Sequence, residues 1–332
     1  MPWPAYWTQV LSEPEPLESM KIGIVGTGAV GAATAMALLA RARISDLRLV
    51  NRNRARAKGV ATDMRYGAPL SGPITIADGD YGDLAGAAAV IVTAGINEKA
   101  GGATDRSDPA GRLRLLDANA KVYEEIVPLI VAAAPEAVLV VATDPPDPLV
   151  DVARRLAGHE RVMGTGTYLD SLRFRVHLAQ RLGMSAASVD AYVVGEHGTS
   201  SVFLWSLVKV GGRSVEQIVA ERDMPLDDFQ RAVERDVRYA NISIIEGIGA
   251  SQYGIGLVTA RLAEAIAADE RAVFPVGSHI ARLGIALSLP GVVGRQGVVE
   301  VITPDMSETE MRALDRSAEK LRDALAKYGT TR

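Results

Sequence analysis

A glycine-rich turn between a strand pattern and a helix pattern constrains this chain most. The segment KIGIVGTGAVG, residues 21–31, is followed by AATAMALLA, a run of strong helix formers. Gly26 permits a tight turn, Gly28 lets the backbone approach a pyrophosphate, and Gly31 allows close packing of the helix. The N-terminus of that helix would then face the phosphate charge. The segment therefore predicts a strand–turn–helix unit that binds a dinucleotide.

Further short apolar segments alternate with helical patterns along the first half of the chain. The candidate strands are LRLVN (47–51), AAVIVTAG (88–95) and AVLVVAT (137–143). Short buried strands that alternate with helices predict an α/β fold of the Rossmann type, with a doubly wound parallel sheet. The run PPDP after Asp144 suits a domain edge, although the helix that begins near Pro148 could still belong to the sheet.

The second half of the chain has a different pattern. Long helical patterns over 226–246 and 305–327 combine with short strands such as GVVEVIT at 297–303. No internal repeat or low-complexity block interrupts them. These patterns predict a C-terminal α+β domain that packs beside the parallel sheet and contributes to a substrate site.

The chain length and these patterns suggest a division into domains. A length of 332 residues exceeds one typical core of ~100–200 residues. We expect a dinucleotide-binding domain over 20–165 and a catalytic domain over 166–332. Residues 1–19 carry Pro, Glu and two Trp without a regular period, so we expect an arm packed on a neighbouring subunit or a leader before a true start at Met20.

Composition narrows the possible partners. The net charge is −4, so no global basic field would attract nucleic acid or anionic lipid. The longest apolar stretches fall short of the ~20 residues of a membrane span, and the N-terminus lacks a basic region before an apolar core. We expect a cytoplasmic protein with a small-molecule partner, not a nucleic acid or a membrane.

Cysteine and histidine usage bears on metal binding. The absence of cysteine excludes disulfides, thiolate nucleophiles and cysteine-ligated metals, and it is compatible with a reducing cytosol. The four histidines, His159, His177, His197 and His279, show no i, i+4 pair of the kind found in helical zinc motifs. We therefore predict no metal.

Three further segments are unlike generic core sequence. They are GRLRLLDAN (111–119), GTYLDSLRFR (166–175) and VVGEHGTSS (193–201). In their residues, order and spacing, together with the glycine-rich turn, the chain resembles the lactate/malate dehydrogenase family, the L-2-hydroxy acid dehydrogenases, from Lys21 almost to its end, as a divergent member. The resemblance implies hydride transfer between NAD(P) and C2 of a small L-2-hydroxy or 2-oxo acid.

The resemblance also implies roles for four residues. His197 in GEHG corresponds to the general acid/base, and Asp170 to the carboxylate that fixes its tautomer. Arg173 corresponds to the arginine that grips the substrate carboxylate, and it shares a helix face with Asp170. Arg112 corresponds to the mobile-loop arginine that polarises the carbonyl; the register of LLDAN favours it over Arg114 or Arg106.

The cofactor preference depends on the residues that follow the second strand. An acidic residue is expected after the second strand, to bind the ribose hydroxyls, but Asn51 stands there with Arg52 and Arg54 after it. This slightly favours NADP over NAD; alternatively Asn51 still binds the ribose and the arginines are solvated. The residues predicted to contact the dinucleotide are Gly26, Gly28, Ala29, Val30, Gly31, Asn51, Arg52, Ala94, Gly95, Asn119 and Thr143.

Several positions around the predicted substrate depart from the family pattern. The loop from Asn97 to Arg112 is longer, and Glu98 falls at the substrate-selecting position, usually Gln for lactate or Arg for malate. A carboxylate there would repel a dicarboxylic acid and could accept a cationic or hydroxylated side chain, unless Glu98 faces solvent or Arg106 takes its place. We therefore predict altered substrate specificity.

Smaller departures affect the same region. Asp144-Pro145 replaces Asn-Pro, so an acceptor-only carboxylate stands where an amide is usual. Asp144 could be an ordinary turn residue, remain protonated, or pair with a positive substrate group. Ser251 replaces a pocket threonine, and Thr199 replaces the usual Asp after GEHG, a change for which we have no functional explanation.

Two other functions fit parts of the sequence. A non-catalytic dinucleotide-binding regulator would keep the glycine-rich turn but would not need Arg112, Asp170, Arg173 and His197 together. An NAD-dependent glycosidase of similar fold uses a metal with a cysteine ligand, which this chain lacks. Members of the resembled family are dimers or tetramers, so a homodimer or homotetramer is expected.

Overall fold

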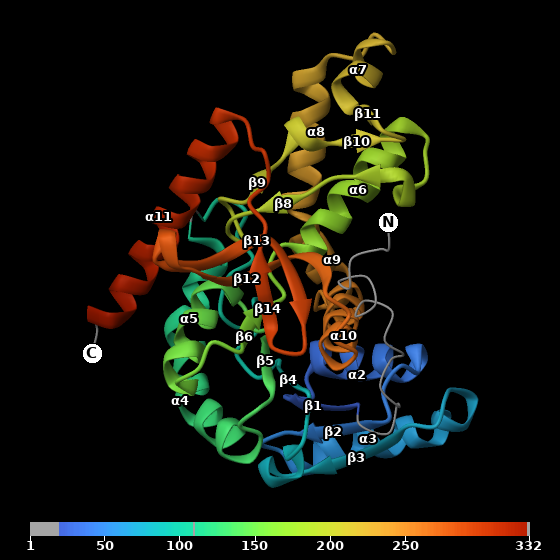
Figure 1. The fold of residues 1–332 in the computed structure, drawn as a ribbon, viewed down its shortest axis with the longest axis vertical. Coiled ribbons are helices and arrows are strands. Elements are labelled where there is room, and N and C mark those ends of the chain that lie inside the picture. The colour runs from blue at the N-terminus through green and yellow to red at the C-terminus, as the bar shows by residue number, and fades with distance from the viewer. Residues whose placement is uncertain (1–19, 109, 331–332) are drawn as a thin grey trace, which may run out of the picture.

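A single nine-stranded sheet runs through the computed structural model, which describes residues 20–108 and 110–330 (Figure 1). The predictions for the N-terminal arm, residues 1–19, lie outside the described residues. The order of the strands is β14-β13-β12-β6-β5-β4-β1-β2-β3. Six of them form the parallel part: β1 (Lys21–Val25), β2 (Asp46–Val50), β3 (Thr75–Gly79), β4 (Ala89–Val92), β5 (Val138–Val141) and β6 (Val162–Gly164).

Helices cover both faces of this sheet, because neighbouring residues of a buried strand point to opposite sides. In β4, Val90 and Val92 pack with α4 (Leu116–Ala133), α5 (Pro146–Ala157) and α11 (Glu308–Thr330). Ala89 and Ile91 of the same strand join the opposite core, under α2 (Ala29–Arg41), α3 (Arg54–Gly67) and α10 (Tyr253–Ala267). The predicted Rossmann-type α/β fold is confirmed.

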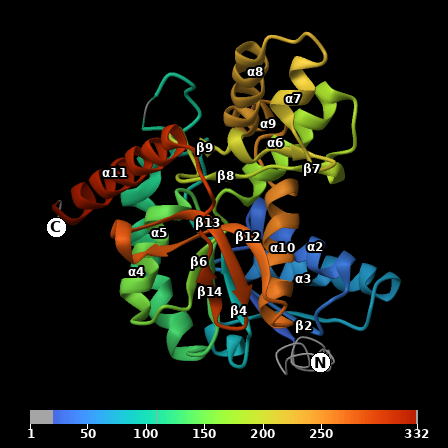
Figure 2. The ribbon, with the colours of Figure 1, turned by 45° about the horizontal axis from the view of Figure 1, so that its top comes forward.

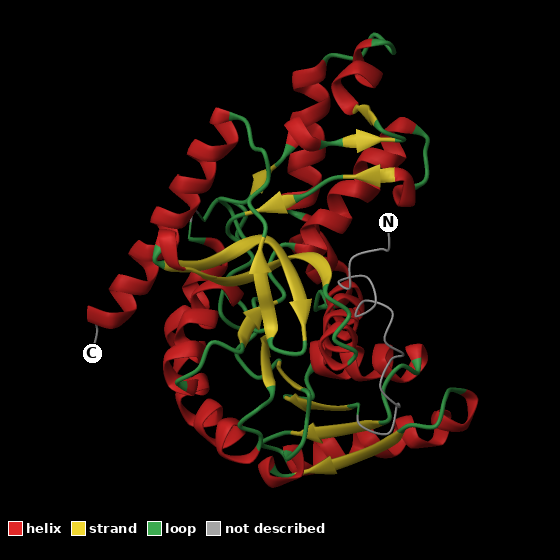
Figure 3. Ribbon diagram, viewed as in Figure 1, coloured by secondary structure: helices red, strands yellow, loops and turns green. Residues whose placement is uncertain are grey.

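The second half extends this sheet and does not build a separate one. β12 (Ala272–Ile280), β13 (Ile285–Gly294) and β14 (Gly297–Val301) add to it in antiparallel fashion, and β12 pairs with β6 through Gly277 and Gly164 (Figure 3). The α+β character of the C-terminal half is therefore correct, but its main strands share the dinucleotide-binding sheet.

A smaller lobe stands above this sheet (Figure 2). Its core lies between α6 (Tyr168–Leu182), α7 (Val215–Ala220), α8 (Leu226–Arg238) and a short sheet of β7 (Val189–Asp190), β10 (Lys209–Val210) and β11 (Arg213–Ser214). A hairpin of β8 (Val193–Val194) and β9 (Val202–Phe203) closes the lobe, and Phe174 stacks edge-on against Phe203. The loop within this hairpin carries His197.

One boundary prediction is wrong. The helical pattern 226–246 is two helices, because α8 ends at Arg238 and α9 (Ala240–Ile248) begins after Tyr239. Of the two interpretations of the PPDP run, the structure supports the one in which the helix belongs to the sheet: α5 begins at Pro146, in the first turn where a helix tolerates proline, and β6 follows it in the parallel sheet. The Asp144–Pro145 peptide bond is cis.

The described residues contain neither a membrane-spanning helix nor a cluster of metal ligands. Within 20–108 and 110–330, no helix combines the length and apolarity that a bilayer crossing requires. In that part of the chain, no three acidic, histidine or cysteine side chains gather as metal ligands would.

Candidate active site

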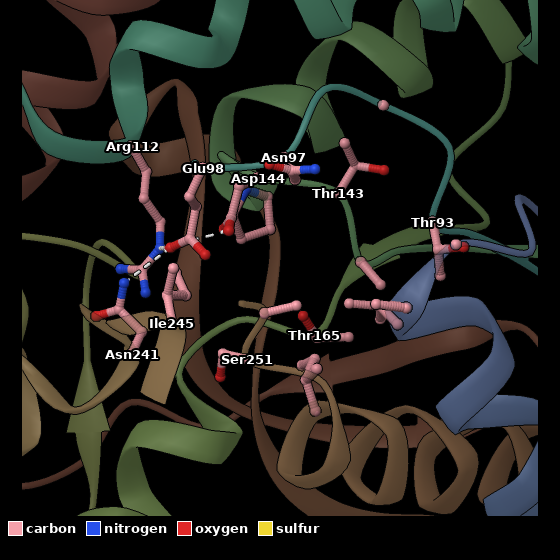
Figure 4. Close-up of a pocket in the computed structure, with 18 of the residues that line it drawn as sticks. Thr93, Asn97, Glu98, Arg112, Thr143, Asp144, Thr165, Asn241, Ile245 and Ser251 are labelled. Atoms are coloured by element: carbon pink, nitrogen blue, oxygen red, sulfur yellow. Dashed lines mark hydrogen bonds and ion pairs between the residues drawn. The ribbon is translucent and has the colours of Figure 1, made fainter. Parts of the chain in front are cut away.

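A pocket opens where the carboxyl ends of β1, β4, β5 and β6 meet, which is the usual ligand position in a doubly wound sheet. The smaller lobe forms its other wall through α6, the His197 loop and α9. Figure 4 shows Glu98, Arg112 and Asn241 at one end of the pocket and Thr93 at the other. The residues that line it include Gly28, Ala29, Val30, Thr93, Gly95, Glu98, Arg112, Thr143, Asp144, Thr165, Arg173, His197, Asn241 and Ser251.

The glycine-rich turn has the shape that a pyrophosphate requires. Gly26 has φ +105°, and a Cβ there would lie 2.6 Å from the backbone nitrogen of Ala94. A Cβ on Gly31 would lie 1.9 Å from the carbonyl oxygen of Gly26, so close packing of α2 demands glycine. Nothing lies within 4 Å of a Cβ on Gly28, and no side chain caps the first turn of α2. Free backbone donors thus face open space, which fits a phosphate group.

Asn51 follows β2, as predicted, but its amide is engaged locally. Its Oδ1 accepts a hydrogen bond of 3.1 Å from the N–H of Thr27, and its Nδ2 donates to the carbonyl oxygen of Asn53. Arg54 pairs with Asp78 and Asp80, whereas Arg52 is exposed. Asn51 therefore supports the glycine-rich turn, and of the two arginines Arg54 is already engaged with Asp78 and Asp80.

The other predicted dinucleotide residues divide into two groups. Gly95 and Thr143 line the pocket. Asn119 is fully buried, and its amide bonds only to backbone: Oδ1 accepts from the N–H of Ile96, and Nδ2 donates to the carbonyl oxygens of Ile96 and Asp144. Asn119 thus holds together the turns after β4 and β5, and Ala94 does not line the pocket.

The predicted catalytic pair is assembled from α6 and the hairpin loop. Nδ1 of His197 bonds to Oδ2 of Asp170, and Nη1 of Arg173 lies 3.1 Å from the other oxygen of the same carboxylate. Nη2 of Arg173 reaches Oγ of Ser251 at 3.5 Å. One buried carboxylate therefore orients both the imidazole and the guanidinium.

These contacts shift the proton affinity of both partners. Burial alone would raise the pKa of Asp170, but His197 and Arg173 hold the pKa of that carboxyl well below its usual value. Burial alone would lower the pKa of His197, but the carboxylates of Asp170 and Asp144 outweigh it and the net pKa is raised. The protonated form of His197 is thus stabilised in this pocket.

Arg112 reaches the same pocket from the loop before α4. Its Nε lies 2.9 Å from Oε1 of Glu98 and 3.4 Å from Oδ2 of Asp144. Asn241 on α9 donates to the same Oε1 of Glu98 at 2.8 Å. Burial raises the pKa of Glu98, and the neighbouring charge of Asp144 raises it further, against the opposing effect of Arg112.

The two other arginines of the long loop lie outside this pocket. Arg106 forms a two-point ion pair with Glu246 on α9, and Arg114 pairs with Asp108. Arg106 therefore does not take the place of Glu98, and Glu98, with a side chain only 12% exposed, does not face solvent.

Sequence reasoning missed the groups that hold the His197 loop. The N–H of His197 donates to Oδ2 of Asp147 at 2.7 Å, and burial raises the pKa of Asp147 to about 7. Glu196 is buried, and its Oε2 lies 3.0 Å from Nζ of Lys320 on α11. An acidic residue at the otherwise apolar start of α5 could have indicated that Asp147 has a structural role. Nothing in the local sequence links Lys320 or Asn241 to this site.

The comparisons with known proteins agree with this geometry. Residues 20–164 match the family model described as lactate/malate dehydrogenase, NAD binding domain, and residues 167–330 match the lactate/malate dehydrogenase, alpha/beta C-terminal domain. The chain is 44% identical to an L-lactate dehydrogenase of Thermus aquaticus and 42% identical to one of Chloroherpeton thalassium. The alignments cover 93% and 92% of this chain and 100% and 99% of those proteins.

Solved structures show the same likeness. A minor L-lactate dehydrogenase from Enterococcus mundtii superposes with a TM-score of 0.85 at 32% identity, over 93% of this chain and 98% of that one. A lactate dehydrogenase from a Medee basin deep-sea metagenome library gives the same TM-score at 30% identity, over 93% of this chain and 99% of that one.

Fold, pocket and relatives together define a dinucleotide-dependent oxidoreductase that acts on 2-hydroxy acids. The chain belongs to the lactate/malate dehydrogenase family.

Proposed function

We propose that this enzyme interconverts a small L-2-hydroxy acid and its 2-oxo acid, with His197 as the proton carrier and NAD(P) as the hydride carrier. The observation that carries the proposal is the shared carboxylate of Asp170, which holds both Nδ1 of His197 and Nη1 of Arg173. A proton carrier and a carboxylate-binding guanidinium are thereby fixed side by side. The L configuration rests on the names of the relatives, which are L-lactate dehydrogenases.

The substrate carboxylate binds the planar guanidinium of Arg173 through two parallel hydrogen bonds, beside the hydroxyl of Ser251. In the direction of reduction, Nε2 of protonated His197 donates a proton to the C2 oxygen while Asp170 stabilises the imidazolium. In oxidation the same nitrogen accepts the hydroxyl proton. The bound dinucleotide supplies or receives the hydride at C2.

Arg112 stabilises the negative charge that develops on the C2 oxygen. Asn97, Glu98 and Lys99 line the pocket together with Arg112, whose side chain is only 11% exposed. We expect these residues to limit the access of water to the reacting atoms. We place Glu98 and Asp144 in the substrate pocket as well, where they disfavour a dicarboxylic acid because two carboxylates already occupy it.

We further propose that 20–165 binds the dinucleotide and 166–332 provides the substrate site, and that the protein acts in the cytoplasm. Gly26, Gly28, Ala29, Val30 and Gly31 would hold the pyrophosphate, and Gly95 and Thr143 would line the nicotinamide half. The prediction that NADP is slightly favoured now rests on Asn51 and Arg52 alone, because Arg54 is paired with Asp78 and Asp80. The matching family model, described as an NAD binding domain, does not add support for NADP.

Assembly into a homodimer or homotetramer also belongs to the proposal. The helices α2 and α10 pack against each other and leave Met36, Tyr253 and Leu257 more than half exposed. Such an apolar surface on adjacent helices fits a second copy of the chain. Light scattering that gives the mass of one chain at working concentration would contradict it.

The role of His197 is tested with His197→Asn. We expect kcat/KM for pyruvate to fall by about 10²–10⁴-fold or more, with the dissociation constant for NADH nearly unchanged. Nucleotide binding, followed by fluorescence, shows that the variant is folded. A variant with activity comparable to the unmodified enzyme would refute the assignment.

A further inference from the structure

Glu98 is one of three carboxylates that meet two guanidiniums in the substrate pocket. Arg173 lies 3.1 Å from Asp170, and Arg112 lies 2.9 Å from Glu98 and 3.4 Å from Asp144. Glu98 adds a third carboxylate to the two guanidiniums. Its side chain is 12% exposed, and only its Oε1 is bound, by Nε of Arg112 and Nδ2 of Asn241.

The net charge of the pocket side chains shows the effect of this third carboxylate. With His197 protonated, as reduction requires, the three carboxylates of Glu98, Asp144 and Asp170 are balanced by His197, Arg112 and Arg173, and a bound substrate carboxylate then leaves one net negative charge. With His197 neutral the excess is two. Lys99 also lines the pocket, but it is exposed, so water screens its charge. An uncompensated charge in a closed, low-dielectric site is unfavourable, and the raised pKa of Glu98 reflects this.

Three kinds of substrate side chain would change this excess of negative charge differently. A second carboxylate would increase it. A hydroxyl or an alkyl group would leave it unchanged. A positively charged nitrogen would reduce it and would supply hydrogen-bond donors to acceptor-only oxygens.

We infer that the substrate is a 2-oxo acid, or the matching 2-hydroxy acid, whose side chain carries a positively charged nitrogen that pairs with Glu98. The inference rests on the proposed function and specifies its substrate class. Arg112 remains compensated by Asp144 when Glu98 turns to the substrate. The reaction is unchanged: hydride adds to C2, His197 protonates the C2 oxygen, and the side-chain nitrogen exchanges nothing.

Placement supports this pairing. In Figure 4, Glu98 and Asn241 lie together at one end of the pocket, away from Thr93 beside the dinucleotide turn. Asn241 bonds to Glu98 through its Nδ2, and its amide oxygen is a further acceptor on this lining residue. A flexible side chain that extends from C2 toward α9 would reach both.

The test is a comparison of kcat/KM, with NADH and with NADPH, for four acids: pyruvate, 2-oxohexanoate, 2-oxoglutarate and the guanidinium acid 5-guanidino-2-oxopentanoate. We expect the guanidinium acid to exceed 2-oxohexanoate by about tenfold or more. In Glu98→Gln the ratio of kcat/KM for the guanidinium acid to kcat/KM for 2-oxohexanoate should fall to about one. The matched control is Glu221→Gln, which removes an exposed carboxylate paired with Arg213 and should leave every ratio unchanged.

The outcomes separate the inference from the proposed function. If 2-oxohexanoate or pyruvate is used as well as the guanidinium acid by the unmodified enzyme, the inference is wrong and the proposed function stands. If no 2-oxo acid is reduced with either cofactor, both are wrong. Because the first comparison needs no variant, misfolding of Glu98→Gln cannot hide a negative result.

Discussion

The carboxylate of Asp144 lies 4.0 Å from Nε2 of His197, so that an acidic group faces each ring nitrogen, Asp170 at Nδ1 and Asp144 at Nε2. Both raise the pKa of the imidazole. The reactive nitrogen therefore stays protonated to a higher pH than an ordinary histidine would.

Replacing Asp144 should move the pH profile. Reduction needs protonated His197, so its kcat/KM declines as pH rises through that pKa. Asp144→Asn removes the second negative charge and should shift this alkaline limb down by about one pH unit. The profile with pyruvate checks it, with the exposed Asp228→Asn as control. An unmoved limb would show that Asp144 does not act on the imidazole.

Asp147 should make stability depend on pH. Burial raises its pKa to about 7, so the folded protein keeps this carboxyl protonated over a range in which the unfolded chain has released the proton. Its contribution to the free energy of unfolding therefore decreases as pH rises from about 4 to about 7, by at most about 4 kcal/mol.

Asp147→Asn removes this dependence while an amide oxygen can still accept the N–H of His197. The free energy of unfolding of the variant minus that of the unmodified protein should be larger at pH 8.5 than at pH 5. Denaturant unfolding at both values measures the difference. Equal differences at the two pH values would mean that Asp147 has an ordinary pKa in the fold.

Lys320 should act on the reaction through the His197 loop. Its Nζ binds Glu196, the residue before His197, whose side chain is buried. Lys320→Met removes the cationic partner of that carboxylate, which still accepts hydrogen bonds from the N–H and hydroxyl of Ser200, and should lower stability by about 1–3 kcal/mol, discounted because Lys320 is partly exposed. We expect kcat to fall more than KM rises, and Lys320→Arg to restore most of it. The exposed Lys209→Met is the control; an unchanged kcat in Lys320→Met would exclude a positioning role.

Arg52 should decide the cofactor preference if NADP is used. Arg52→Ala is expected to lower kcat/KM for NADPH by about tenfold and to leave kcat/KM for NADH nearly unchanged, because only NADPH carries a 2′-phosphate on its adenosine ribose. Arg54→Ala should have a weaker effect, since Arg54 already pairs with Asp78 and Asp80. Equal or better use of NADH by the unmodified enzyme would remove the preference for NADP.

Much of the site was predictable because its chemistry lies in short segments. The turn around Gly26, the Asp170–Arg173 spacing on one helix and the GEHG run around His197 are local patterns, and the structure brings them together at one pocket. The helix break at Tyr239 was not predictable, because the helical pattern continues through it without a proline or glycine.

Sequence by itself determined the fold class, the dinucleotide turn and the identity of the charged groups, since each depends on local propensity or spacing. Only the tertiary structure decided which charges meet. Glu98 lies 143 positions from Asn241, and Glu196 lies 124 from Lys320. Such pairs are set by how helices pack on the shared sheet, so the surplus negative charge in the pocket is a property of the folded chain.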